Sequence, residues 1–280
     1  MASSNPLISR EGFRYLFEQI TEPKNSTRIL AQLVDSLYDP LVRVQPQIRE
    51  HGSYDLRKVK KDLQYKGITE LLGTLGVKDK RGLVEFCCGN GELSFYLARQ
   101  LDIDVLGVDI NPDLIEKNRV KNTQPHLGFI VRDLYADKPR INGNVFLALH
   151  SCGRLLDRIL DLASATRTNT EVVVVPCCYG KINNEQKILP RSQELKSQRE
   201  LFLQAVKKAA RFEGLVGNHP GTRGDLMLET FRRLVDFDRV FYLQEQGYET
   251  SFVRISPRSL ALETREYGLS PANVAIIGQR

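Results

Sequence analysis

From about residue 82 the chain alternates between short apolar runs and longer amphipathic stretches. Runs such as EVVVVP (171–176) have the length and β-branched composition of buried strands, whereas stretches such as GRLLDRILDLASA (153–165) have helical spacing. Five such units and two closing strands predict an α/β fold, with a seven-stranded, mostly parallel sheet and helices on both faces. The expected strands are 82–86, 104–110, 127–134, 145–150, 171–176, 250–256 and 273–278, and the expected helices are 91–101, 112–122, 153–165, 192–212 and 224–246.

The first 75 residues show a different pattern, in which short helical segments are interrupted by prolines. The apolar spacing in 28–38 predicts one such helix, a basic stretch at 55–66 a second and 68–76 a third, ended by Gly76. The sequence therefore predicts a small helical region over 1–75, which recognises the substrate or caps a pocket, and a main domain over 76–280.

Composition limits the class of protein. No apolar run reaches the roughly 20 residues of a membrane helix, and the first residues lack a signal-peptide pattern, so we expect an intracellular, cytoplasmic protein that contacts no membrane. The net charge of +6 and the pI of about 9.0 suit an anionic partner such as RNA, or simply a mildly basic protein. The stretch 55–66 and three arginines (Arg232, Arg233 and Arg239) face either a phosphate backbone or solvent.

A glycine loop, CCGNG (87–91), joins the first expected strand to the first expected helix. Such a loop alone is weak evidence, because nicotinamide-binding proteins share it, normally with a third glycine where this chain has Ser94. Three carboxylates narrow the choice: Glu85 lies within the strand, and Asp109 and Asp133 end the next two strands. A carboxylate beside the loop repels a pyrophosphate and favours a cationic ligand such as S-adenosylmethionine.

The two strand-end aspartates each have an expected partner in that ligand. Asp109 lies 109 − 85 = 24 residues after Glu85, the usual distance for a ribose acceptor, and Asp133 is placed to accept from the adenine amino group. The alternative for both aspartates is a local role as a helix N-cap or turn residue.

The segments LVEFCCGNGELS (83–94), VDINP (108–112), ALHSCG (148–153) and PCCYGK (176–181) carry a family resemblance. Over residues 80–280 the chain resembles the class I S-adenosylmethionine-dependent methyltransferases. The nearest branch includes the tRNA acceptor-stem ribose 2′-O-methyltransferase and the methyltransferase-like part of the glutathione S-transferase C-terminal domain-containing protein. The chain lacks the tRNA enzyme's N-terminal Cys/His zinc modules and has Tyr179-Gly180 where that enzyme has histidines.

The resemblance implies a Rossmann-like methyltransferase that uses S-adenosyl-L-methionine and acts on RNA, with tRNA favoured in tRNA processing. It assigns a set of cofactor-binding positions around the loop and the first four strand ends. These positions are Glu85, Cys87, Gly89, Asn90, Gly91, Asp109, Ile110, Asp133, Leu134 and His150.

In the fold that the resemblance implies, the first strand neighbours the fourth and the fourth neighbours the fifth, so the five cysteines come toward one edge of the sheet. Their spacing is poor for zinc, so we expect no metal. The candidate catalytic residues are His150, Cys177, Cys178 and Tyr179.

Two chemistries stay open for these residues. In one, His150 or Tyr179 positions or deprotonates the acceptor for direct methyl transfer, or His150 only closes the cofactor pocket. In the other, Cys177 or Cys178 attacks a pyrimidine ring as an RNA cytosine-C5 methyltransferase. A protein or small-molecule methyltransferase and a non-catalytic cofactor-binding protein are the remaining alternatives.

Overall fold

A computed structural model describes most of the chain. The described residues are 10–21, 32, 36, 56–77, 82–136, 141–151, 153–166, 170–177, 190–213, 223–255 and 274–280. The helix expected over 28–38 lies almost entirely outside them, as do Cys152, Cys178 and Tyr179.

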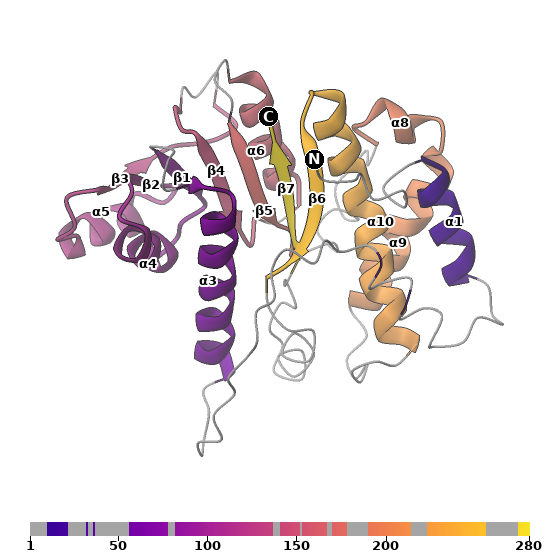
Figure 1. The fold of residues 1–280 in the computed structure, drawn as a ribbon, viewed down its shortest axis with the longest axis horizontal. Helices are drawn as coiled ribbons and strands as arrows, with labels where there is room; N and C mark the ends of the chain where they lie inside the picture. Colours follow the sequence, from indigo (N-terminus) through magenta and orange to yellow (C-terminus); the bar gives the residue numbers. More distant parts are fainter. Residues whose placement is uncertain are drawn as a thin grey trace.

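Seven strands form one sheet in the order β3-β2-β1-β4-β5-β7-β6 (Figure 1). Strands β1 to β5 are parallel, and β7 pairs antiparallel with both β5 and β6. The predicted α/β fold and the predicted neighbours of the fourth strand are thus confirmed. The strands are β1 (Leu83–Phe86), β2 (Val105–Asp109), β3 (Leu127–Val131), β4 (Val145–Leu149), β5 (Glu171–Val175), β6 (Glu249–Arg254) and β7 (Val274–Gln279).

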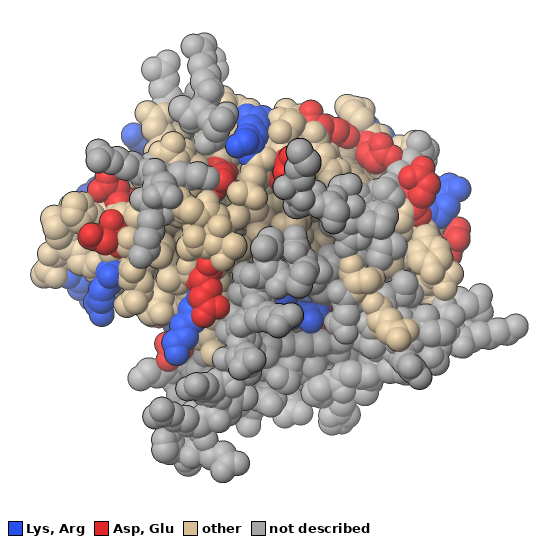
Figure 2. Space-filling model, viewed as in Figure 1, with Lys and Arg blue, Asp and Glu red and all other residues tan. Residues whose placement is uncertain are grey.

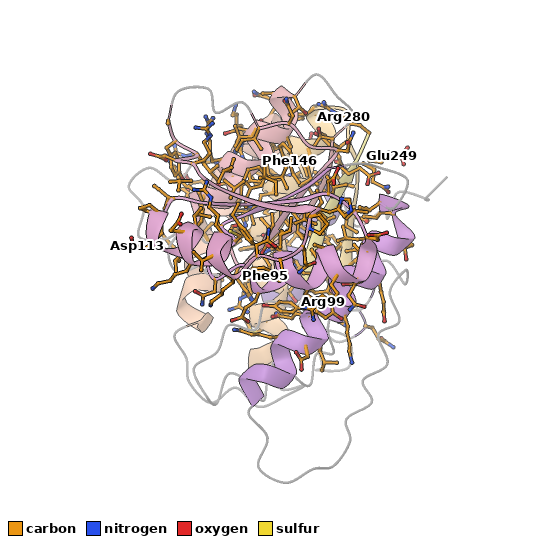
Figure 3. All side chains as sticks on the ribbon, turned by 90° about the vertical axis from the view of Figure 1, so that its left-hand side faces the viewer. Phe95, Arg99, Asp113, Phe146, Glu249 and Arg280 are labelled. Atoms are coloured by element: carbon orange, nitrogen blue, oxygen red, sulfur yellow. The ribbon has the colours of Figure 1, made fainter. Side chains whose placement is uncertain are left out.

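Helices cover both faces of the sheet, because successive side chains of each strand point to opposite sides. One face packs against α3, α4 and α5, and the other against α1, α6, α8, α9 and α10. Phe95 and Phe146 lie on opposite sides of the strands in Figure 3. The helices are α1 (Arg10–Thr21), α3 (Leu56–Thr74), α4 (Glu92–Leu101), α5 (Pro112–Lys121), α6 (Arg154–Ala165), α8 (Gln193–Lys196), α9 (Arg199–Glu213) and α10 (Arg223–Glu245).

Two predicted helix boundaries are wrong. The segments 55–66 and 68–76 form one continuous helix, α3, because no proline interrupts them and Gly67 packs against the backbone of Ile255. The single helix expected over 192–212 is instead two helices. The side chain of Ser192 caps α8, which ends after one turn at Ser197 before α9 begins.

The arginines of α10 are also not where the sequence predicted. Arg232, Arg233 and Arg239 are all buried, so they face neither solvent nor a phosphate backbone. The reason is that α10 is enclosed by other helices and by the sheet over residues 229–241. Acids compensate the burial of two of these cations: Arg233 contacts Asp236 at 3.2 Å, and Arg239 contacts Asp236 at 2.7 Å and Asp157 at 2.8 Å.

The N-terminal helices pack on opposite faces of this sheet. Phe13 and Phe17 of α1 are buried and make edge-to-face contacts with Phe237 and Phe231 of α10. Helix α3 instead packs beside α4 (Figure 1). Of the described helices, none is long and apolar enough to cross a membrane.

Candidate functional site

The loop Cys87–Gly91 turns the chain from β1 into α4 at the carboxyl edge of the sheet. Its backbone is left-handed at Cys87 (φ 59°), Gly89 (φ 52°) and Gly91 (φ 70°). The amide of Gly91 donates to the carbonyl of Cys88 at 2.8 Å, which closes the turn. A residue other than glycine in this region, as at Cys87, is uncommon, and such strain concentrates at functional sites.

The two loop glycines have different surroundings. A Cβ on Gly91 would lie 2.9 Å from the ring of Phe129 and 3.0 Å from the amide nitrogen of Asn118, so close packing requires glycine there. A Cβ on Gly89 would meet nothing within 4 Å. The backbone of Gly89 therefore borders open space, as a loop that approaches a ligand must.

Asp109 holds this loop from the neighbouring strand. Its carboxylate accepts hydrogen bonds from the amides of Gly89 (2.9 Å) and Asn111 (3.0 Å). The N-cap of α5 is Asn111, whose side chain accepts from the amide of Asp113 at 2.9 Å, so Asp109 does not cap that helix. Each carboxylate oxygen retains acceptor capacity for a ligand hydroxyl.

The end of β3 borders the same edge. Asp133 lies two residues beyond β3, not within it as predicted, and its carboxylate accepts from the amide of Tyr135 at 2.8 Å. This is the turn role given above as the alternative, although the carboxylate remains exposed. Leu134 is buried, whereas Ile110 is 64% exposed, so Ile110 offers an apolar surface beside Asp109.

Glu85 is the buried carboxyl group of the site. It is only 4% exposed in the middle of β1, and the hydroxyl of Ser94 donates a short hydrogen bond to it. Burial raises the pKa of Glu85 to about 8, and the nearby carboxylate of Asp109 acts in the same direction. A cation that entered this place would be stabilised by ionisation of the carboxyl group.

His150 directly follows β4, where its amide donates to the carbonyl of Val175 on β5 at 3.2 Å. Its backbone is left-handed (φ 65°) although it is not glycine. The Nε2 atom of its ring lies 3.3 Å from the side-chain oxygen of Gln64, a buried residue of α3.

The cysteines of the described residues lie around the same edge. Cys88 and Cys177 are buried and Cys87 is half-buried. Burial is the main cause that raises the pKa of the Cys88 thiol, with a further contribution from Glu85. Among the described residues, no group of three or more possible metal ligands converges.

Three polar residues of the site were not predicted. Ser94 binds Glu85, Gln64 contacts His150, and Asn118 is fully buried on α5 with its amide donating to the carbonyl of Gly89 at 2.8 Å. For Asn118 the sequence held a signal: it lies three residues after Ile115, on the apolar side of an expected helix. Ser94 occupies the third-glycine position. Nothing in the sequence pairs Gln64 with a residue 86 positions away.

Comparisons with known proteins found one family model and several relatives. Residues 64–185 match a family model described as a methyltransferase domain. The human glutathione S-transferase C-terminal domain-containing protein is 28% identical over 200 residues, which is 70% of this chain and 29% of that protein. Its homologue in Drosophila melanogaster is 25% identical over 182 residues, 62% of this chain and 30% of that protein. The chain thus spans less than a third of the length of these relatives.

Among solved structures, magnesium protoporphyrin IX methyltransferase from Synechocystis, with bound S-adenosylhomocysteine, is 13% identical with a TM-score of 0.47. The similarity covers 83% of this chain and 90% of that one. The family match agrees with the predicted enzyme class, a methyltransferase, for the domain over residues 64–185.

Proposed function

We propose that this chain transfers the methyl group of S-adenosylmethionine to RNA, with tRNA as the favoured acceptor. The observation that carries the enzymatic part is the arrangement of one buried carboxyl group, one open loop and one partly exposed carboxylate. Glu85 offers a buried carboxyl group for a cation, Gly89 offers an open backbone, and Asp109 offers a carboxylate for nucleoside hydroxyls.

The residues present fit this cofactor. With the cofactor bound, Glu85 would hold its ammonium group, the backbone of Gly89 and Asn90 would border the methionine part, and Asp109 would accept from the ribose hydroxyls. The exposed side chain of Ile110 and the turn at Asp133 would flank the adenine. The sulfonium of the cofactor supplies an activated methyl group.

The acceptor enters between the ends of β4 and β5 in this proposal. The methyl transfer is direct and non-covalent, and His150 closes the cofactor pocket or positions the accepting group, because its Nε2 contacts Gln64 and its Nδ1 is buried. Cys177 is buried at the end of β5 and serves packing. Cys178 and Tyr179 lie outside the described residues and remain sequence predictions as acceptor-side groups.

RNA is proposed as the acceptor from the net charge of +6 and the motif resemblance. The charge does not form one patch on the described part of the face in Figure 2, where basic and acidic side chains are interspersed. We therefore assign RNA contact to the N-terminal region, residues 1–75, which contains the basic stretch 55–66. Lys66, at its end, has an exposed side chain. We place the enzyme in the cytoplasm.

Cofactor binding is tested by isothermal titration of the purified chain with S-adenosylhomocysteine. We expect binding in the micromolar range and a loss of at least tenfold in Asp109→Ala. Asp113→Ala is the matched control, because Asp113 is exposed four residues further along the chain and its side chain is not part of the proposed site. No binding by the unsubstituted chain would refute the proposed function.

The acceptor is tested with tritiated S-adenosylmethionine incubated with total RNA and total protein from cells that lack the gene. Nucleoside analysis of labelled RNA identifies the modified atom. Label in protein alone would overturn the RNA proposal but keep the enzyme class, and cofactor binding without label in any fraction would favour a non-catalytic binding protein. A covalent complex with 5-fluorocytosine RNA that is lost in Cys177→Ser or Cys178→Ser would instead support cytosine-C5 methylation.

A further inference from the structure

A cavity of about 300 Å³ lies in the helical layer on the α6 side of the sheet. Its walls come from α6, α9 and α10, from the chain before α8 and from Tyr135, which follows β3. The volume is at the lower end of the range of small-molecule sites, roughly 300–1,000 Å³. None of the described residues that line the cavity belongs to the proposed cofactor site, so the cavity is a separate place on the same domain.

The acids of this cavity are already paired. Asp157 lies 2.8 Å from Nε of Arg239. Asp161 binds the guanidinium of Arg191, whose backbone amide donates to Asp238 at 2.9 Å. The three carboxylates are therefore engaged within the protein, which makes a cationic ligand a poor fit.

Two more arginines, Arg154 and Arg158, line the cavity one helical turn apart on α6. Nε of Arg158 donates to the carbonyl of Leu134 at 2.7 Å, and within the described part of the chain neither of its terminal nitrogens makes a hydrogen bond to the protein. Arg154 is exposed as the first residue of α6, where the helix dipole favours an anion. A guanidinium binds phosphate oxygens in pairs, so a phosphate group is the anion that suits these two arginines best.

The ring of Tyr135 lines the same cavity and is 61% exposed. Neighbouring contacts fix its place: its amide donates to Asp133 at 2.8 Å, and the preceding Leu134 is buried and accepts from Arg158. An exposed aromatic ring offers a face on which a nucleic-acid base stacks. The cavity thus presents a phosphate-binding group next to a base-binding group.

We propose that this cavity binds a nucleoside monophosphate unit, with the phosphate held by Arg154 and Arg158 and the base stacked on Tyr135. The same unit has two sources, a strand of RNA and a free mononucleotide. The RNA source rests on the proposed function, in which the chain methylates RNA, and the cavity then holds a nucleotide other than the reacting one. The binding chemistry itself does not depend on methyl transfer.

The first test is isothermal titration of the full chain with uridine 5′-monophosphate, uridine and inorganic phosphate. One set of titrations contains saturating S-adenosylhomocysteine, which occupies the proposed cofactor site, and a second set omits it. We expect the monophosphate to bind at least about tenfold more tightly than uridine or phosphate alone in both sets, because it uses both groups of the cavity. No binding of the monophosphate, or binding that S-adenosylhomocysteine abolishes, overturns the proposal.

The second test uses variants of the two groups. Arg158→Gln and Tyr135→Ala are each expected to weaken uridine 5′-monophosphate at least about tenfold, while the Kd of S-adenosylhomocysteine changes less than about twofold. Arg119→Gln is the matched control for the arginine, because Nε of Arg119 makes the same kind of bond, to the carbonyl of Phe129 at 3.0 Å, away from the cavity. Tyr15→Ala is the control for the tyrosine, because Tyr15 is 46% exposed on α1.

Arg154→Gln changes an exposed side chain, so it keeps the test decisive if Arg158→Gln does not fold. Unchanged affinity in both Arg154→Gln and Tyr135→Ala, or an equal loss in the two controls, overturns the proposal.

Titration with pentauridylate separates the two sources of the ligand. An affinity at least about tenfold above that of the monophosphate, lost in the same variants, assigns the cavity to RNA, whereas equal affinity assigns it to a free mononucleotide. Failure of the proposed function is distinct from these results. It appears as absent S-adenosylhomocysteine binding or absent methyl transfer in the unsubstituted chain, while uridine 5′-monophosphate still binds.

Discussion

Gly67 of α3 lies against the carbonyl of Ile255, which directly follows β6. A Cβ on Gly67 would be 1.9 Å from that oxygen, a distance that requires the helix and the strand end to separate. The absence of a side chain at residue 67 therefore sets how closely α3 approaches the sheet.

Gly67→Ala should destabilise the protein by at least about 1–3 kcal/mol, as overpacking of a tight interface does. Gly73→Ala in the same helix is the control, because a Cβ there meets nothing within 4 Å and alanine favours helix by up to about 1 kcal/mol. Urea denaturation midpoints check both values. Equal stability of the two variants would contradict the close contact.

Substitutions at Gly89 and Gly91 should separate ligand binding from folding. Gly91→Ala combines a left-handed backbone with a clash against Phe129, so we expect a loss of about 2–3 kcal/mol of stability. Gly89→Ala carries only the backbone cost of about 1 kcal/mol, because its surroundings are open. Its methyl group enters the proposed cofactor space, so S-adenosylhomocysteine affinity should fall at least tenfold. Unchanged affinity in Gly89→Ala would show that the cofactor does not approach this loop.

Glu85 should make stability depend on pH. Its pKa in the folded protein is raised from 4.5 to about 8, so between these values the folded state retains a proton that the unfolded chain has released. Stability from this group is full below about pH 4.5 and decreases as pH rises through about 8.

Glu85→Gln should remove this decrease, because glutamine does not ionise. Melting temperatures of the unsubstituted chain and of Glu85→Gln, measured from pH 5 to 8.5, should converge at low pH and diverge at high pH, with the glutamine variant more stable. Glu92→Gln is the control, because Glu92 is exposed at the start of α4. Parallel curves for Glu85→Gln and the unsubstituted chain would contradict the raised pKa.

Arg239 links α10 to α6 through Asp157 and is only 3% exposed. Arg239→Met leaves Asp157 and Asp236 without this cation, and we expect a loss of about 3–5 kcal/mol, as for other broken buried pairs. Lys61→Met is the comparison, because its 2.9 Å contact with Glu92 is half exposed and should contribute less than about 1 kcal/mol. Chemical denaturation of both variants measures the difference.

The fold was largely predictable because its signals are local. Runs such as Leu83–Phe86 and Glu171–Val175 identify strands by composition, and Pro112 after Asn111 identifies the start of α5. Glu85, the glycine loop and Asp109 were predictable for the same reason, since parallel strand ends bring them to one edge.

The polar contacts that complete the site were decided only by the tertiary structure. Gln64 meets His150, and Arg239 meets Asp157, across distances in sequence that no local pattern spans. From the sequence of a helix alone, a charged or amide side chain is expected to be exposed to solvent. Its burial, and hence its pairing, depends on which other helices and strands pack around it. The sequence by itself determined the seven strands of a mostly parallel sheet and the loop at its edge. Packing of α3 and α10 decided which polar groups are enclosed, because the cost of burying them is met only by partners that the complete fold brings together.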